Sequence, residues 1–194
     1  MKNTSLIFEN NETPNAGGFL LSDPFMGDPF FERSVVYLCQ HDQEGTFGFV
    51  LNNPLGLNLH DVLDHVEVKD QPLFIGGPVA KNQLFFLHNA GDKIEHSLSC
   101  GHDVYFSGDF DSLVSYIKVN GYKKLNIKYF VGYSGWDENQ LNEEIEGHSW
   151  IAVNNIPSSF IFNENSQQLW KACMELQGNK FKMIAKFPKN PNEN

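Results

Sequence analysis

The feature that most restricts the fold is a pair of consecutive segments, residues 34–39 and 46–51, both rich in β-branched and aromatic side chains. Such residues favour strands. The link between the two segments is polar and ends in Gly45, which predicts an antiparallel hairpin. Further strands are predicted at residues 18–23, 73–75, 84–87, 104–106, 125–131 and 150–153. Because these strands do not alternate regularly with helices, the order favours an α+β domain over a doubly wound parallel sheet.

Four short helices complete the predicted fold. Two of them cover residues 58–66, with Asn58 as the N-cap, and residues 137–146. The others begin at Asp109 and Ser166, and each ends at a following glycine, Gly121 or Gly178. The chain has 194 residues and no linker or repeat, so we expect one domain over residues 18–187, with flexible segments at 1–17 and 188–194.

Charge and cysteine content restrict the partners and the compartment. There are 14 basic and 24 acidic residues, which gives a net charge of −10, and Arg33 is the single arginine. This balance makes direct binding to duplex DNA a poor hypothesis, although residues 180–189 hold four lysines that form either a solvated end or a nucleic-acid arm. The three cysteines show no metal or redox spacing. With no signal peptide and no apolar run long enough for a membrane helix, we expect a reduced, cytoplasmic protein.

The most distinctive segment is Gly132-Tyr-Ser-Gly-Trp136, which the pattern places in a turn between a strand and a helix. Gln140 follows Asp137 at the spacing of a capping box. Two interpretations are open. In the first, backbone N–H groups of the turn bind an anion. In the second, Gly132 and Gly135 serve only to shape the turn, and Trp136 fills the core. The segment is a poor nucleophile elbow, because an elbow needs glycine on both sides of the serine and Trp136 occupies the second position.

Other candidates for chemistry lie nearer the N-terminus. Arg33 follows a proline-rich loop with three acids, Asp23, Asp28 and Glu32, and either forms a bidentate pair that locks the loop or binds a substrate. His41 lies in the hairpin link, and the histidines show no metal-binding spacing. The Gly-Gly-Pro-Val run at residues 76–79 lacks the lysine of a phosphate loop. We therefore predict no metal, no cofactor and no catalytic residue.

Four ordered blocks resemble the YqgE/AlgH family over about residues 17–178. They are Gly18-Phe-Leu-Leu with Asp28-Pro-Phe-Phe-Glu-Arg33-Ser-Val-Val-Tyr-Leu and His41; Gly48-Phe-Val-Leu-Asn52-Asn-Pro54; Gly76-Gly77-Pro-Val; and Gly132-Tyr-Ser-Gly-Trp136 with Gln140-Leu, Glu144 and Trp150. The resemblance implies a bacterial, cytosolic protein with a bifurcated β-sheet curled into a pseudo-barrel. The family name derives from a proposed role in the transcriptional regulation of alginate synthesis. The resemblance carries over no catalytic residue, and the family often has alanine where this chain has Ser134.

Three functions follow as hypotheses, and the first is a non-catalytic regulatory or protein-interaction module. The second is a small-molecule-binding protein or unorthodox hydrolase with a cleft near Arg33, Gly76-Gly77 and residues 132–140, which requires Arg33, Asn52 and Gln140 to line one pocket. The third is direct DNA binding through the lysine-rich end. The candidate binding residues are Asp28, Arg33, His41, Asn52, Gly76, Gly77, Gly132, Ser134, Gly135, Trp136 and Gln140.

Overall fold

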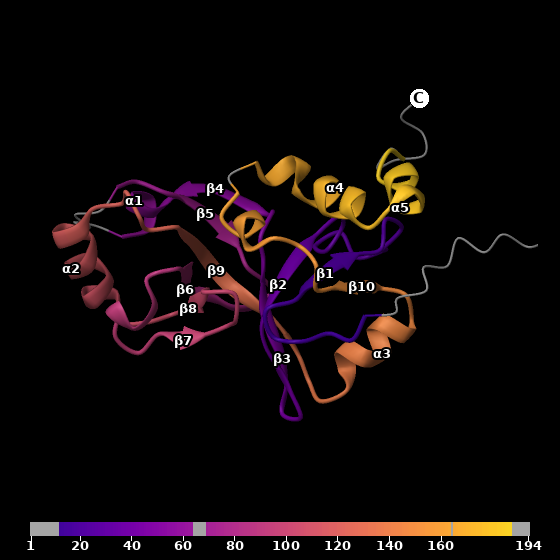
Figure 1. Ribbon diagram of the computed structural model, residues 1–194, viewed down its shortest axis with the longest axis horizontal. Coiled ribbons are helices and arrows are strands. Elements are labelled where there is room, and N and C mark those ends of the chain that lie inside the picture. The colour runs from indigo at the N-terminus through magenta and orange to yellow at the C-terminus, as the bar shows by residue number, and fades with distance from the viewer. Residues whose placement is uncertain (1–11, 64–68, 164, 188–194) are drawn as a thin grey trace, which may run out of the picture.

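A computed structural model describes residues 12–63, 69–163 and 165–187 (Figure 1). The strands are β1 (Phe19–Ser22), β2 (Val35–Asp42), β3 (Gly45–Val50), β4 (Pro54–Asn58), β5 (Pro72–Ile75), β6 (Val79–His88), β7 (Leu98–Ser99), β8 (Tyr105–Phe106), β9 (Ile127–Trp136) and β10 (Trp150–Val153). The α-helices are α1 (Leu59–Val62), α2 (Phe110–Asn120), α3 (Gln140–Glu146), α4 (Ser166–Leu176) and α5 (Asn179–Ile184).

The ten-residue strand β9 is the branch point of the sheet. Its residues 129–131 pair in parallel with β5 on one edge and antiparallel with β6 on the other. Residues 134–136 pair with β3, which continues into β2, β1 and β10. The sheet therefore has two arms that share β9. The first arm holds β10, β1, β2 and β3, and the second holds β4 to β8 (Figure 1).

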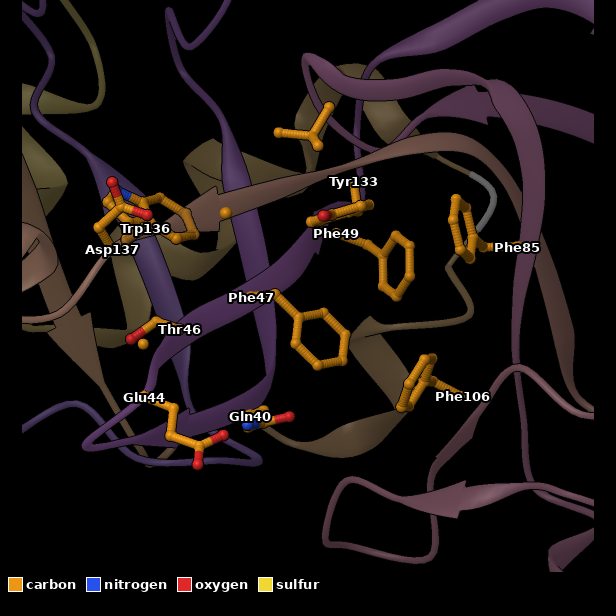
Figure 2. A pocket seen from close by; sticks show the side chains of 13 residues that line it. Gln40, Glu44, Thr46, Phe47, Phe49, Phe85, Phe106, Tyr133, Trp136 and Asp137 are labelled. Atoms are coloured by element: carbon orange, nitrogen blue, oxygen red, sulfur yellow. The ribbon is translucent and has the colours of Figure 1, made fainter.

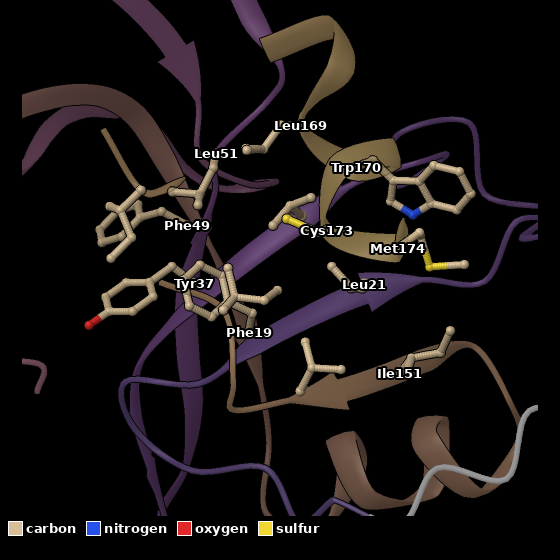
Figure 3. Close-up of a cluster of buried hydrophobic side chains, with 14 of the residues drawn as sticks. Phe19, Leu21, Tyr37, Phe49, Leu51, Ile151, Leu169, Trp170, Cys173 and Met174 are labelled. Carbon is tan, nitrogen blue, oxygen red and sulfur yellow. The ribbon is translucent and has the colours of Figure 1, made fainter. Parts of the chain in front are cut away.

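The first arm is covered on both faces, because alternate side chains of its strands enter two different cores. On one face Phe19, Tyr37 and Phe49 belong to a core cluster that also includes Trp170 and Cys173 of α4 (Figure 3). On the opposite face a second cluster packs around α3. Its members are Leu20, Val36, Leu38, Val50, Trp136, Leu141, Trp150 and Ala152. Because both faces are covered, consecutive residues of β1 and β10 are all buried.

The second arm has its own core beneath α2. Leu113 and Ile117 of α2 pack with Leu73 of β5, Phe86 of β6 and Tyr129 of β9. The helix begins as the sequence predicts, since the Asp109 side chain accepts a hydrogen bond from the Ser112 N–H at 2.7 Å. It ends at Gly121, whose φ of +66° favours glycine.

The expected single α+β domain with a bifurcated sheet is confirmed. Its curl stops short of a closed barrel, because β10 and β7 are the two ends of an open path of paired strands. The predicted hairpin is β2–β3, with Val36 opposite Val50. Across the described ranges, no helix has the length and apolar character needed to span a bilayer.

Several predicted boundaries were wrong. The helix predicted at 58–66 begins as expected after Asn58 but is a single turn, because the backbone of Leu63 is extended; the end of that prediction lies outside the described residues. The short pieces β4, β7 and α5 were not predicted. The predicted terminal segments fall largely on residues 1–11 and 188–194, outside the described ranges, so the domain boundaries stay a prediction.

Cys39, Cys100 and Cys173 are all buried free thiols. Desolvation and the neighbouring thiol of Cys100 raise the pKa of Cys39 well above its usual value. The fold thus brings together two thiols that their spacing in the sequence does not connect.

Candidate functional site

The Gly76-Gly77 pair carries the chain across β9. Since β5 and β6 pair with opposite edges of β9, the link between them must pass over that strand. A Cβ at Gly77 would overlap the backbone of Tyr133, and one at Gly76 would overlap the carbonyl oxygen of Gly132. Only glycine permits this contact of backbone with backbone. These two candidate residues therefore occupy a crossing of two chain segments.

Gly132 and Ser134 hold the other side of the crossing. Gly132 has φ +71°, and a Cβ there would lie 2.7 Å from the carbonyl oxygens of Gly77 and Val79. The Ser134 hydroxyl is buried and donates to the Gly76 carbonyl at 3.0 Å. That carbonyl also accepts from the Val50 N–H at 2.9 Å. Ser134 is thus used to fasten the crossing.

The turn predicted at residues 132–136 was wrong, because β9 continues through Trp136 and α3 begins only at Gln140. The anion-binding turn and the nucleophile elbow disappear with it. One half of the predicted capping box is present, since the Gln140 side chain accepts from the Asp137 N–H at 3.0 Å.

A single carboxylate joins the rest of this block. Glu144 of α3 accepts from the indole N–H groups of Trp136 at 2.9 Å and Trp150 at 2.8 Å. Its other oxygen accepts from the Gln140 side-chain amide at 2.9 Å. The two indole rings meet edge to face at 5.8 Å. This Trp–Glu–Trp clamp ties β9, α3 and β10 together, so Trp136 and Gln140 have structural contacts.

Arg33 lies elsewhere, in a second structural cluster. Its guanidinium lies 5.2 Å from the ring centre of Trp170 and donates to the carbonyl of Phe187. Within the described ranges it forms no ion pair with Asp23 or Asp28, so neither aspartate makes a bidentate lock with it. The loop is held instead by turns in which each aspartate accepts a backbone N–H two residues on, Asp28 from Phe30 at 2.8 Å.

The small-molecule hypothesis requires Arg33, Asn52 and Gln140 to line one cleft, and the structure does not place them together. Arg33 and Asn52 line one cavity of about 530 Å³ beside α4, and Gln140 is not part of it. The Asn52 side chain there accepts from the Val35 N–H and donates to the Arg33 carbonyl, both at 2.8 Å. His41 lines a different cavity, and Ser134 lines neither.

A hollow with an aromatic lining lies between the two arms, where β3 and β6 flank β9. We call it the aromatic pocket; it has a volume of about 560 Å³ (Figure 2). Six aromatic residues line it: Phe47 and Phe49 of β3, Phe85 of β6, Phe106 of β8, and Tyr133 and Trp136 of β9. The rings support one another, with Phe47 4.9 Å from Phe106 and Tyr133 5.8 Å from Phe85, both edge to face.

One end of the aromatic pocket is acidic. Glu44 and Asp137 line it together with Gln40 and Thr46, and Figure 2 shows these polar groups apart from the cluster of Phe85 and Phe106. A neighbouring hollow of about 280 Å³, which we call the polar pocket, shares part of this wall. The shared residues are Gly45, Thr46 and Asp137, and the polar pocket adds His41, Asp42, Gln43, Glu138, Asn139, Leu141 and Asn142.

Within the polar pocket, His41 Nδ1 lies 2.7 Å from the Thr46 hydroxyl. This is the spacing of a base and a hydroxyl nucleophile. In the described part of the chain no carboxylate or carbonyl bonds to the other ring nitrogen of His41, so the third member that orients such a pair is missing. Nor does the described chain hold a cluster of three or more side chains suited to a metal ion.

The sequence reasoning missed the aromatic pocket almost completely. Of its lining residues only Gly135 and Trp136 were among the candidates. The available signal was the high phenylalanine content of 17 residues, but a strand phenylalanine is usually core. Phe47, Phe85 and Phe106 are only partly buried, which the sequence does not display.

Comparison with known proteins agrees with this architecture. The AlgH-like family model matches residues 19–182. Among curated relatives, a UPF0301 protein of Parabacteroides distasonis is 41% identical over 98% of this chain and 96% of its own, and one of Cytophaga hutchinsonii is 40% identical over 92% and 98%. The solution structure of the AlgH protein from Pseudomonas aeruginosa superposes with a TM-score of 0.70 at 25% identity, covering 94% of this chain and 98% of that one. A crystal structure from Corynebacterium diphtheriae, with a TM-score of 0.74 at 23% identity over 93% and 95% of the two chains, shows the same fold. The chain belongs to the AlgH-like family.

Proposed function

We propose that this protein is a non-catalytic regulatory or protein-interaction module whose recognition site is the aromatic pocket. The observation that carries the proposal is the open hollow of about 560 Å³ lined by six aromatic residues. Partly exposed aromatic side chains are the residues that anchor protein–protein contacts. The candidate residues that resemble chemistry, Ser134, Trp136 and Gln140, are engaged in fastening the fold.

The charge distribution favours a protein partner over nucleic acid. Both carboxylates that line the aromatic pocket, Glu44 and Asp137, would repel a phosphate backbone, and the chain has a net charge of −10. Regulation of transcription, if it is the biological outcome, then proceeds through contacts with another protein. The compartment expected from the cysteine content is cytoplasmic, where such a partner would be met.

The experiment is a quantitative capture of partners from a native lysate with three forms of the chain: wild type, Phe106→Ala and Val119→Ser. Phe106 lines the pocket, whereas Val119 is 83% exposed on α2. We expect a stoichiometric protein partner with wild type and Val119→Ser, reduced at least about tenfold with Phe106→Ala. Recovery of no stoichiometric partner, or equal recovery by Phe106→Ala, contradicts the proposal.

The alternative of an unorthodox hydrolase has one observation in its favour, the contact between His41 and Thr46. If Thr46 is a nucleophile, wild type hydrolyses activated esters such as p-nitrophenyl acetate and Thr46→Val does not. The non-catalytic proposal predicts a rate equal to that of Thr46→Val. A burst of product with wild type alone would favour the hydrolase.

A further inference from the structure

The aromatic pocket and the polar pocket are adjacent and together give a surface with two chemical halves. They share the lining residues Gly45, Thr46 and Asp137, so they lie next to each other. The aromatic half holds the phenylalanines of β3, β6 and β8. The other half holds carboxylates from the β2–β3 hairpin and from the link between β9 and α3. They are Asp42, Glu44, Asp137 and Glu138.

From this segregation we infer that the partner is a basic protein segment, which inserts one aromatic or long aliphatic side chain among the rings and lays flanking Lys or Arg residues along the carboxylates. This inference rests on the proposed function and specifies the chemistry of the partner. It commits to a peptide segment because the combined surface extends beyond the room that one side chain occupies. A residue in extended conformation advances about 3.3 Å, so neighbouring residues of a segment reach the polar pocket.

Charge complementarity supplies the first argument. The residues that line the two pockets include four carboxylates, and His41 is their only ionisable nitrogen base. Gln40 lies beside them and donates to Asp42 at 2.6 Å. A cationic segment is therefore attracted, and an acidic one is repelled.

The rings supply the second argument. Phe106 and Phe47 are partly exposed, although both pack against the core cluster that contains Phe49. An aromatic or long aliphatic anchor would remove their remaining surface from water. This burial favours binding by about 25 cal/mol of free energy per Å² of apolar area. Edge-to-face pairs such as Phe47 with Phe106 also hold the rings in place before binding, which lowers the entropy cost.

The probes are capped pentapeptides, and binding is measured by isothermal titration calorimetry at low and high salt. The basic probe is acetyl-Lys-Lys-Trp-Lys-Lys-amide. The controls are the same peptide with Glu in place of Lys, and the same peptide with Ala in place of Trp. We expect each control to bind at least about tenfold more weakly, and the basic probe to lose affinity as salt rises.

Variants locate the contact. Glu44→Gln and Asp137→Asn should each weaken the basic probe about threefold, as expected for partly exposed ion pairs. Asp111→Asn is the matched control, because it removes the same charge from an exposed position on α2 in the second arm. Phe106→Ala should weaken the probe about tenfold. Phe106→Leu, which retains apolar volume, guards against a local loss of folding and should weaken binding less.

The outcomes separate the inference from the proposed function. If the lysate partner depends on Phe106 but the basic and acidic peptides bind alike, the cationic chemistry is overturned and the interaction function stands. If tryptamine binds as tightly as the basic pentapeptide, the occupant is a small organic cation rather than a segment, and the inference fails. If the protein forms a dimer that Phe106→Ala abolishes, the occupant is a second copy, and the inference also fails.

Discussion

At the scale of single residues, the glycine and serine positions that look like chemistry build a crossing of two strands. Gly76 and Gly77 have no room for a Cβ against β9, and Ser134 donates to the Gly76 carbonyl. The sequence alone indicated that these residues are candidates for a functional site. It did not predict their structural role at the crossing. The steric demand comes from a second strand that lies far away in the chain, and a local pattern holds no information about such an approach.

The crossing predicts a large cost for the smallest possible side chain. Gly77→Ala would place a methyl group inside the backbone of Tyr133, so we expect a loss of about 3 kcal/mol or more in the free energy of unfolding. Urea unfolding monitored by circular dichroism measures it. Gly27→Ala is the control, because nothing lies within 4 Å of its Cβ. Equal stability of the two variants would contradict the crossing.

Removing the Ser134 hydroxyl is a second test of the same crossing. Ser134→Ala removes one hydrogen bond but leaves the Val50 N–H on the Gly76 carbonyl, so we expect a loss of about 1 kcal/mol. Partner capture should be unchanged if the serine only fastens the fold. A variant of unchanged stability that no longer captures the partner would give Ser134 a direct functional role instead.

At the scale of elements, predictions succeeded where the signal is local. The hairpin β2–β3 and the capped helix α2 depend on residues next to one another, and both are found. Residues 132–136 were misread as a turn because two glycines usually interrupt a strand, whereas here Gly132 lets β9 pass beneath the crossing. The aromatic pocket could not be predicted, since its rings come from four strands.

The Trp–Glu–Trp clamp joins three elements, so its loss should loosen α3. Glu144→Ala leaves the indole N–H groups of Trp136 and Trp150 without their acceptor. We expect a loss of about 2 kcal/mol and a changed near-ultraviolet circular dichroism spectrum. Glu143→Ala on the exposed face of α3 is the control and should stay within about 0.5 kcal/mol of wild type. Equal spectra and equal stability for both variants would show that the clamp does not stabilise the fold.

At the scale of the whole molecule, a buried histidine makes stability depend on pH. His88 is fully buried, with Nδ1 accepting from the Ala90 N–H and Nε2 close to Ser97 and the Ser107 carbonyl. Desolvation lowers its pKa to about 4 from an ordinary value near 6.5. Between these values the unfolded chain binds the proton and the folded chain does not, so stability falls as pH decreases.

This difference in pKa corresponds to about 3 kcal/mol lost between pH 6.5 and 4. Chemical unfolding over that range measures the slope. His88→Asn retains an acceptor for the Ala90 N–H and should have a shallower slope, whatever its absolute stability. His96→Asn, at an exposed position where φ is +60°, should keep the slope of wild type. A wild-type curve that is flat over this range would contradict the neutral, buried state of His88.

The two arms of the sheet form the scaffold of the molecule, and the aromatic pocket lies open between them. The central claim is that partners bind at the aromatic pocket and not at the glycine–serine crossing or beside Arg33. The most direct measurement is amide chemical-shift mapping of the labelled chain when the captured partner is added. The account predicts the largest shifts at Phe47, Phe106 and Gly135, around the aromatic pocket. Shifts centred on Arg33 and Trp170, with the aromatic pocket unchanged, would contradict it.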